Sequence, residues 1–282
     1  MERQQNTKKF FERTAKNFGS DPILIPGGSQ FRNKILDTIM KIRLIPILND
    51  FQKQSFLEIG TGIGRWCKII SKKNFVVGVD ISRFMVQEAK NLIDNEKCFF
   101  VVGDASHLPF KDDAFDFVIS ITVLQHILNQ TRLLKAISEI SRCSRNNIII
   151  VEEMWNETTL SLEAVQYPIR ISSTNFYIKE LSSQGYIVES LKGLTFAPLA
   201  IFLAKFFIFL SQFISISFKN NLEKPKKFTF KIKIINFALG CSLFSDLIYA
   251  RVYPQKSFNA QLSLHTLIHL KKRHKRIRSN LK

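Results

Sequence analysis

Hydrophobic residues occur in short continuous runs along the first two thirds of the chain, with amphipathic stretches between them. Apolar runs of about five residues are typical of strands that are buried on both faces of a sheet. The predicted strands span 55–59, 75–79, 98–102, 115–120 and 147–151. Apolar positions three or four residues apart predict helices over 33–48, 65–71, 84–93 and 132–142, the first interrupted late by Pro46. This alternation predicts a doubly wound α/β fold with a mostly parallel sheet.

The composition fits a globular chain. The chain has 282 residues, of which 45% are hydrophobic, and this length is enough to bury a core without disulfides. Its four cysteines lie far apart, so no pair has the spacing of a zinc site or a redox-active pair. We therefore expect reduced thiols and no metal. Residues 1–18 lack the apolar core of a secretory signal, and we expect a cytoplasmic protein.

The positive charge is concentrated in the last third of the chain. Residues 1–190 hold 24 Lys and Arg against 21 Asp and Glu, whereas residues 191–282 hold 17 against 2. A near-neutral core followed by a basic, apolar region indicates a docking surface joined to a binding domain. We predict four parts, which are an N-terminal helical cap (1–54), the core (55–192), an apolar and basic helical insertion (193–262), and a last strand with a basic tail (263–282).

Candidate ligand-binding residues follow three of the predicted strands. Gly60, Gly62 and Gly64 come directly after the first strand, where glycines allow a ligand close to the backbone. Asp80 ends the next strand, where a carboxylate can accept both ribose hydroxyls, and Asp104 follows the third. Taken alone, Asp80 is equally typical of a helix N-cap and Asp104 of a turn. Their shared position at strand ends favours a nucleoside ligand.

The spacing of the glycines separates two kinds of cofactor. A dinucleotide-binding loop needs Gly or Ala at the position that Arg65 occupies, because the helix must approach the strand closely beneath a pyrophosphate. The sequence has GxGxG instead, which disfavours NAD and FAD. S-adenosylmethionine has no pyrophosphate and is compatible with this loop.

Four motifs in order resemble the class I S-adenosylmethionine-dependent methyltransferases, specifically the small-molecule, type 11-like kind. They span residues 57–65, 78–82, 103–110 and 115–126. The resemblance implies S-adenosyl-L-methionine as the cofactor and a seven-stranded sheet, completed by a helix over 176–184, a strand over 185–189 and an antiparallel strand over 265–271. The residues it implies for cofactor binding are Glu58, Gly60, Thr61, Gly62, Gly64, Arg65, Asp80, Ile81, Asp104, Ala105 and Ser120.

The resemblance also gives these residues separate roles. It places Glu58 and the glycine loop at the methionine portion, Asp80 at the ribose, and Ile81 and Asp104 at the adenine. Because methyl transfer is an in-line displacement, a dedicated base is optional. His126 is the first candidate for a catalytic base, with a structural or cofactor-shell histidine as the alternative; His107 and Glu153 are weaker candidates.

The last third of the chain suggests where the methyl acceptor is found. Residues 194–218 are dominated by apolar side chains, and their polar residues recur on one helical face, which favours a helix lying in a membrane interface. Each nearby Lys or Arg adds about 1 kcal/mol of attraction to an anionic leaflet. A lid or dimer interface, a transmembrane hairpin and an RNA-binding tail are the alternatives.

Together these features predict a cytoplasmic enzyme that is peripheral on the membrane. We expect it to methylate a lipid-like or lipid-linked small molecule, such as a quinone precursor or glycan intermediate, at an anionic membrane surface. The alternatives are an RNA methyltransferase and a catalytically inactive, cofactor-binding assembly subunit on the membrane.

Overall fold

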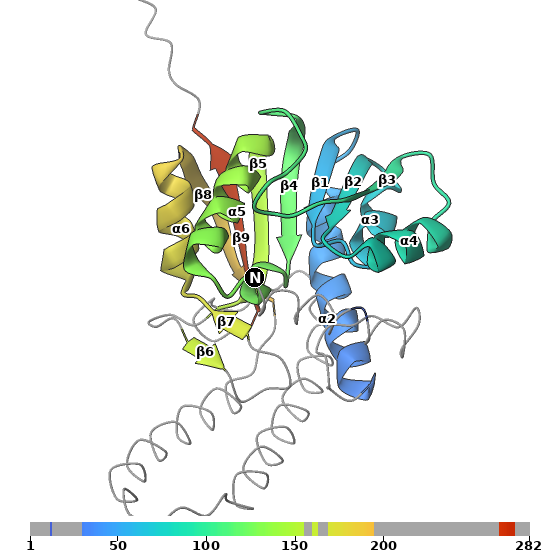
Figure 1. The fold of residues 1–282 in the computed structure, drawn as a ribbon, viewed down its shortest axis with the longest axis horizontal. Coiled ribbons are helices and arrows are strands. Elements are labelled where there is room, and N and C mark those ends of the chain that lie inside the picture. Colours follow the sequence, from blue (N-terminus) through green and yellow to red (C-terminus); the bar gives the residue numbers. More distant parts are fainter. Residues whose placement is uncertain (1–11, 13–29, 155–159, 163–168, 195–264, 274–282) are drawn as a thin grey trace, which may run out of the picture.

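Each predicted apolar run forms a strand in the computed structural model (Figure 1). The structure describes residues 12, 30–154, 160–162, 169–194 and 265–273. The strands of the main sheet are β1 (Ser55–Ile59), β2 (Phe75–Asp80), β3 (Cys98–Val102), β4 (Phe115–Ile121), β5 (Ser144–Glu153), β8 (Tyr186–Gly193) and β9 (His265–Lys272). The helices are α2 (Gln30–Asn49), α3 (Arg65–Ile70), α4 (Arg83–Leu92), α5 (Gln130–Cys143) and α6 (Thr174–Ser183), with a 3₁₀ turn η1 (Leu124–His126).

The seven strands form one mixed sheet in the order β3-β2-β1-β4-β5-β9-β8. Strands β1 to β5 are parallel, whereas β9 runs antiparallel to both β5 and β8. The α/β architecture, the sheet of seven strands and the antiparallel strand near residue 265 are therefore confirmed. The predicted apolar insertion and the basic tail beyond residue 273 lie outside the described residues, and the division into four domains stays a prediction.

Alternate residues of the strands pack into two hydrophobic clusters, one on each face of the sheet. Phe56 of β1 belongs to the cluster that α2, α3 and α4 cover, and Leu57 belongs to the cluster beneath α5 and α6. Both side chains are fully buried. This alternation gives the period of two that a strand imposes, with apolar residues on both sides. The core therefore holds the strand ends in fixed positions.

Two local features differ from the sequence prediction. Helix α2 continues through Pro46 and ends at Asn49, whereas the sequence predicts an interruption. A short hairpin of β6 (Leu160–Leu162) and β7 (Ile169–Ile171) was not predicted. Three-residue strands are too short to show a hydrophobic period, so the sequence has no signal for them.

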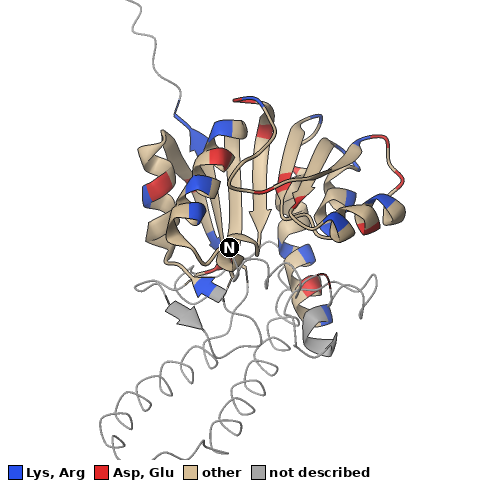
Figure 2. Ribbon diagram, viewed as in Figure 1, with Lys and Arg blue, Asp and Glu red and all other residues tan. Residues whose placement is uncertain are grey.

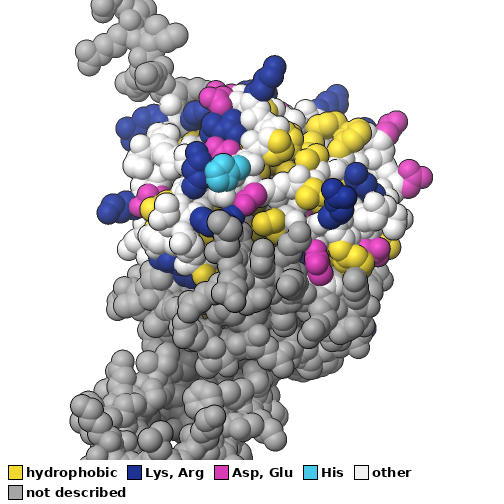
Figure 3. All heavy atoms as spheres, viewed as in Figure 1, with side chains coloured by type: hydrophobic (Ala, Val, Ile, Leu, Met, Phe, Trp, Pro, Cys, Tyr) yellow, Lys and Arg dark blue, Asp and Glu magenta, His cyan; other side chains and the backbone are white. Residues whose placement is uncertain are grey.

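The surface of the described part is mixed in charge. Lys, Arg, Asp and Glu lie mainly on helices and loops around the sheet, and the strands carry few of them (Figure 2). Figure 3 shows hydrophobic side chains gathered over the half of this face that contains β1, β2 and β3. Among the exposed apolar side chains are Phe75 and Phe99, which are 44% and 49% exposed and whose ring centroids lie 5.4 Å apart. Strand β3 is thus an edge strand with an apolar surface.

Candidate cofactor and methyl-transfer site

The candidate site lies where the carboxyl ends of the parallel strands meet. Strand β1 pairs with β2 on one side and with β4 on the other, so the loops leaving β1 and β4 diverge at this edge of the sheet. In open α/β sheets, ligands bind at such a point, where the strand order reverses. The predicted binding residues lie at the carboxyl ends of β1, β2 and β4, in the loops after β1, β2 and β3, and at the start of α3.

The glycine loop turns sharply after β1 and is tied to β2. Gly60 and Gly62 have positive φ angles of 68° and 56°, a region that favours glycine. The Gly60 and Thr61 amides donate to the Val79 carbonyl at 2.7 and 3.0 Å. A Cβ atom at Gly60 would lie 2.5 Å from Cγ1 of Val123, whereas one at Gly62 would meet nothing within 4 Å. The loop therefore packs against Val123, which follows β4, and has open space beside Gly62.

Glu58 supports this loop from below. Its side chain is 2% exposed, and its Oε2 atom accepts hydrogen bonds from the Cys67 amide at 2.9 Å and from Thr61 Oγ1 at 3.0 Å. Burial raises the pKa of Glu58 to about 7, although these hydrogen bonds lower it in part. Among the described residues, the hydrogen bonds to Glu58 come from the loop and helix α3, so this carboxyl group lies beneath the loop.

Asp80 links the second strand end to the glycine loop. Its Oδ2 atom accepts a hydrogen bond from the Gly62 amide at 2.9 Å, and its Oδ1 atom accepts one from the Ser82 amide at 2.9 Å. The residue that caps helix α4 is Ser82, whose hydroxyl accepts from the Met85 amide at 3.2 Å. Asp80 is therefore not the N-cap. Ile81, beside it, is 37% exposed, and its role at the adenine stays a prediction.

Asp104 is held in a turn after β3. Its Oδ1 atom accepts hydrogen bonds from the amide and hydroxyl of Ser106 at 2.9 and 2.8 Å, and its Oδ2 atom pairs with Arg132 of α5. Burial raises the pKa of Asp104, but the Ser106 hydrogen bonds and the Arg132 ion pair outweigh burial and lower the pKa overall. Asp104 therefore makes turn contacts, and its role at the adenine stays a prediction. Ala105 follows it in the same turn and is half-buried.

Ser120 and His126 bracket the turn after β4. Ser120 is buried, and its hydroxyl donates to Glu152 Oε1 at 3.4 Å. Burial lowers the pKa of His126 to about 4, although a hydrogen bond with the Thr122 backbone raises it in part. The imidazole is therefore neutral at pH 7 and weakly basic. The role of His126 as a catalytic base stays a prediction.

Arg65 joins the loop to the N-terminal helix. Its guanidinium forms an ion pair with Asp37 of α2 and lies 4.7 Å from the centroid of the Trp66 ring. The side chains of Arg65 and Asp37 are only 17% and 10% exposed. Sequence reasoning missed Asp37, because a single acidic residue on an amphipathic helix gives no sign of its distant partner.

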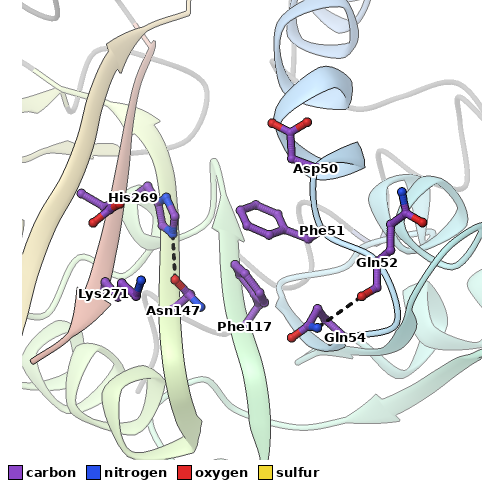
Figure 4. Close-up of a pocket in the computed structure, with 9 residues that line it drawn as sticks. Asp50, Phe51, Gln52, Gln54, Phe117, Asn147, His269 and Lys271 are labelled. Carbon is purple, nitrogen blue, oxygen red and sulfur yellow. Dashed lines mark hydrogen bonds between the residues drawn. The ribbon is translucent and has the colours of Figure 1, made fainter. Parts of the chain in front are cut away.

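A second hollow lies at the opposite edge of the sheet. A pocket of about 510 Å³ is lined by nine residues, among them Phe51, Phe117, Asn147, His269 and Lys271 (Figure 4). His269 Nε2 and Asn147 Oδ1, which come from the neighbouring strands β9 and β5, are 3.0 Å apart on one side of it. Phe117 and Asn147 stand near the amino ends of β4 and β5, so this pocket is separate from the cofactor site.

The described residues include free thiols but neither a metal-binding cluster nor a membrane-spanning helix. Among these residues, no group of three or more His, Cys, Asp or Glu side chains is arranged to hold a metal ion. Cys67, Cys98 and Cys143 are buried free thiols. Of the helices in the described ranges, none is both long enough and apolar enough to span a membrane.

Comparison with known proteins places this site in a class. A structure of magnesium protoporphyrin IX methyltransferase from Synechocystis with bound S-adenosylhomocysteine superposes with a TM-score of 0.53 at 17% identity, covering 68% of this chain and 92% of that one. At 17% identity, this superposition shows that the two chains share a fold. Residues 57–151 match the family model described as a methyltransferase domain. The resemblance seen in the sequence is thus confirmed.

Curated relatives are similar over part of their length. An uncharacterised protein of Methanocaldococcus jannaschii is 29% identical over 54% of this chain and 64% of its own length. Ajmaline N-methyltransferase of Rauvolfia serpentina is 26% identical over 47% of each chain. Probable tRNA methyltransferase 9B of Homo sapiens is 36% identical over 30% of this chain and 18% of its own length. The matches therefore cover less than two thirds of each of these relatives.

Proposed function

We propose that the chain binds S-adenosylmethionine at the carboxyl edge of its sheet and transfers the methyl group to a small-molecule acceptor. The observation that carries this proposal is the Asp80 carboxylate beside a glycine loop that is open over Gly62. A backbone amide and a carboxylate side by side suit a ribose, and open space at Gly62 lets a ligand approach the main chain. These residues fit an adenosyl group, and GxGxG spacing with nearby carboxylates suits a cationic sulfonium better than a pyrophosphate.

The chain's own residues align the reactants and exclude water. S-adenosylmethionine supplies the reactive methyl carbon when it is bound. The glycine loop and Asp80 orient the adenosyl end, and the turn after β4 forms the neighbouring wall through Val123, which packs on Gly60. With a pKa of about 4, the neutral His126 ring accepts a proton only weakly at neutral pH. This arrangement favours an acceptor whose nucleophile is reactive without a strong base.

For the acceptor, we propose a lipid-like or lipid-linked molecule that is reached from an anionic membrane surface. The support is the excess of Lys and Arg over Asp and Glu in residues 191–282, 17 against 2, combined with the apolar stretch 194–218. Both features fall mainly outside the described residues. The competing acceptor is RNA. It is favoured by the similarity to a probable tRNA methyltransferase, which extends over 30% of this chain.

Titration calorimetry with S-adenosylhomocysteine tests cofactor binding directly. We expect one site per chain, and an absence of binding to the wild-type protein would refute the proposed function. Radiolabelled S-adenosylmethionine incubated with separate lipid, RNA and protein extracts then identifies the acceptor class. Label in lipid, together with sedimentation on anionic vesicles that persists after RNase treatment, supports the lipid acceptor. Label in RNA supports the alternative, and cofactor binding without any labelled product indicates an inactive subunit.

A further inference from the structure

The buried carboxylate of Glu152 holds the turn that follows β4. Glu152 stands near the carboxyl end of β5 and is 0% exposed. Its Oε1 atom accepts hydrogen bonds from the Val123 amide at 2.9 Å and the Leu124 amide at 2.8 Å. Longer bonds come from the Gln125 amide to Oε2 and from the Ser120 hydroxyl to Oε1, both at 3.4 Å. One carboxylate thus receives four donors from β4 and the turn after it.

The turn needs such an anchor because its backbone is strained. Thr122 has a φ angle of +56°, in the left-handed region, although its side chain is β-branched. A non-glycine residue in this region costs of order 1–3 kcal/mol and persists only where its surroundings hold it. The Thr122 amide donates to the Val151 carbonyl at 2.7 Å, and the three amides that follow it face Glu152. Strand β5 therefore fixes the turn at both ends.

The position of this turn determines one wall of the cofactor site. A Cβ atom at Gly60 would lie 2.5 Å from Cγ1 and 3.0 Å from Cβ of Val123, so the valine packs directly on the glycine loop. A displacement of Val123 would therefore reach Gly60 without any intervening side chain. Glu152 belongs to β5, and the glycine loop follows β1. The contact of Val123 with Gly60 therefore connects the anchor on one side of β4 with the loop on the other side.

We propose that Glu152 is a positioning residue for cofactor binding. It fixes the turn 122–125 so that Val123 packs on Gly60 and keeps the glycine loop in the conformation that accepts the adenosyl cofactor. This inference rests on the proposed function. Among the described residues, the hydrogen bonds to Glu152 come from β4 and the turn after it, so Glu152 acts through Val123 and does not take part in the chemistry.

The chemistry of the anchor explains why it is a glutamate. All four of these partners donate. Burial raises the pKa of Glu152 to about 7, although the amide hydrogen bonds lower it in part, and above that pH the carboxylate offers acceptor positions only. In a glutamine, the amide nitrogen would face a backbone N–H at one of these positions, leaving a buried donor without an acceptor. An aspartate is one methylene shorter and would not reach the turn from the same backbone position. The site therefore discriminates against both close substitutes.

The test compares two variants in which a carboxylate becomes an amide at opposite ends of the sheet. Glu152→Gln removes an acceptor beneath the turn. Asp116→Asn is the matched control, because Asp116 accepts from the Ser55 amide at 2.9 Å and the Ser55 hydroxyl at 2.7 Å at the amino edge of β1 and β4. Calorimetry with S-adenosylhomocysteine should show at least tenfold weaker binding for Glu152→Gln and binding within twofold of wild type for Asp116→Asn. Both variants should lose thermal stability.

A double-mutant cycle separates positioning from general destabilisation. Because Glu152 acts through Val123, the losses of affinity in Glu152→Gln and Val123→Ala should be non-additive, whereas Glu152→Gln and Asp80→Asn should be closer to additive. Thr122→Gly removes the backbone strain that the anchor opposes, and should restore part of the lost affinity in the Glu152→Gln background. If Glu152→Gln does not fold, Glu152→Asp takes its place, since the shorter side chain also withdraws the acceptor from the turn, and its loss of affinity should be non-additive with that of Val123→Ala.

The outcomes distinguish this inference from the proposed function. Wild-type protein that fails to bind S-adenosylhomocysteine overturns both. Wild-type protein that binds, with Glu152→Gln binding equally well, overturns the positioning role alone. The role is also overturned if Asp116→Asn weakens binding as much as Glu152→Gln, or if the loss in Val123→Ala is additive with that in Glu152→Gln or in Glu152→Asp.

Discussion

Replacing Gly60 and Gly62 separately with alanine tests how tightly the glycine loop is packed. Both residues have left-handed backbones, with φ angles of 68° and 56°. Alanine in this region costs about 1–2 kcal/mol, and both variants should lose that amount of unfolding free energy. Gly60→Ala should lose about 1–3 kcal/mol more, the typical cost of overpacking, because its Cβ would lie 2.5 Å from Cγ1 of Val123. No atom lies within 4 Å of the corresponding position at Gly62.

Urea denaturation followed by circular dichroism measures both losses in the cofactor-free protein. The second arm of the experiment combines Gly60→Ala with Val123→Ala, which removes both Cγ atoms and leaves the Val123 Cβ position 3.0 Å away. The double variant should recover about 1–3 kcal/mol relative to the sum of the single losses. Equal losses for Gly60→Ala and Gly62→Ala, or no recovery in the double variant, would show that the loop and the β4 turn are not in contact.

Three further predictions concern charged groups near the site. Asp80→Asn should weaken S-adenosylmethionine binding by about 10- to 100-fold in calorimetry, because one acceptor and the negative charge are lost; unchanged affinity would remove Asp80 from the site. Asp37→Asn should lower the unfolding free energy by about 3 kcal/mol in urea titrations, since it leaves the largely buried Arg65 without its counter-charge; a loss under 1 kcal/mol would contradict this. Burial raises the pKa of Glu58 from 4.5 to about 7. Between pH 4.5 and 7, Glu58 is therefore protonated in the folded state and ionised in the unfolded state. Acidification from pH 7 to 4.5 should raise the unfolding free energy of wild type relative to Glu58→Gln by about 1.4 kcal/mol per pH unit. Parallel plots of unfolding free energy against pH for the two proteins would show that Glu58 has an ordinary pKa.

The strands of the sheet were predictable because their side chains are buried on both faces. A run such as residues 148–151 is apolar throughout, and this signal does not depend on distant partners. The glycine loop and Asp80 were predictable for a similar reason, since their spacing along one βαβ unit is a local feature. The structure brings them together through the hydrogen bond between Asp80 and the Gly62 amide.

The supporting contacts of the site could not be read from the sequence. Glu152 and Val123 are 29 residues apart and meet because β4 and β5 are neighbours in the sheet. Asp37 and Arg65 are 28 residues apart and meet through the packing of α2 on α3. Such contacts depend on tertiary structure, and neither acidic residue belongs to a recognisable motif. The sequence thus indicates the residues that line a ligand more readily than those that hold them in place.

The antiparallel strand β9 has a consequence for synthesis on the ribosome. It fills the place between β5 and β8, although about 70 residues separate it from the end of β8 along the chain. At about 5–20 residues per second, β9 is translated several seconds after β8. Throughout that interval, β5 of the nascent chain has one unpaired edge and strongly apolar side chains. Strand β8 has no neighbour in the sheet until β9 is made. The growing polypeptide therefore passes through a stage at which chaperones have a defined target, and this stage ends when the last strand inserts.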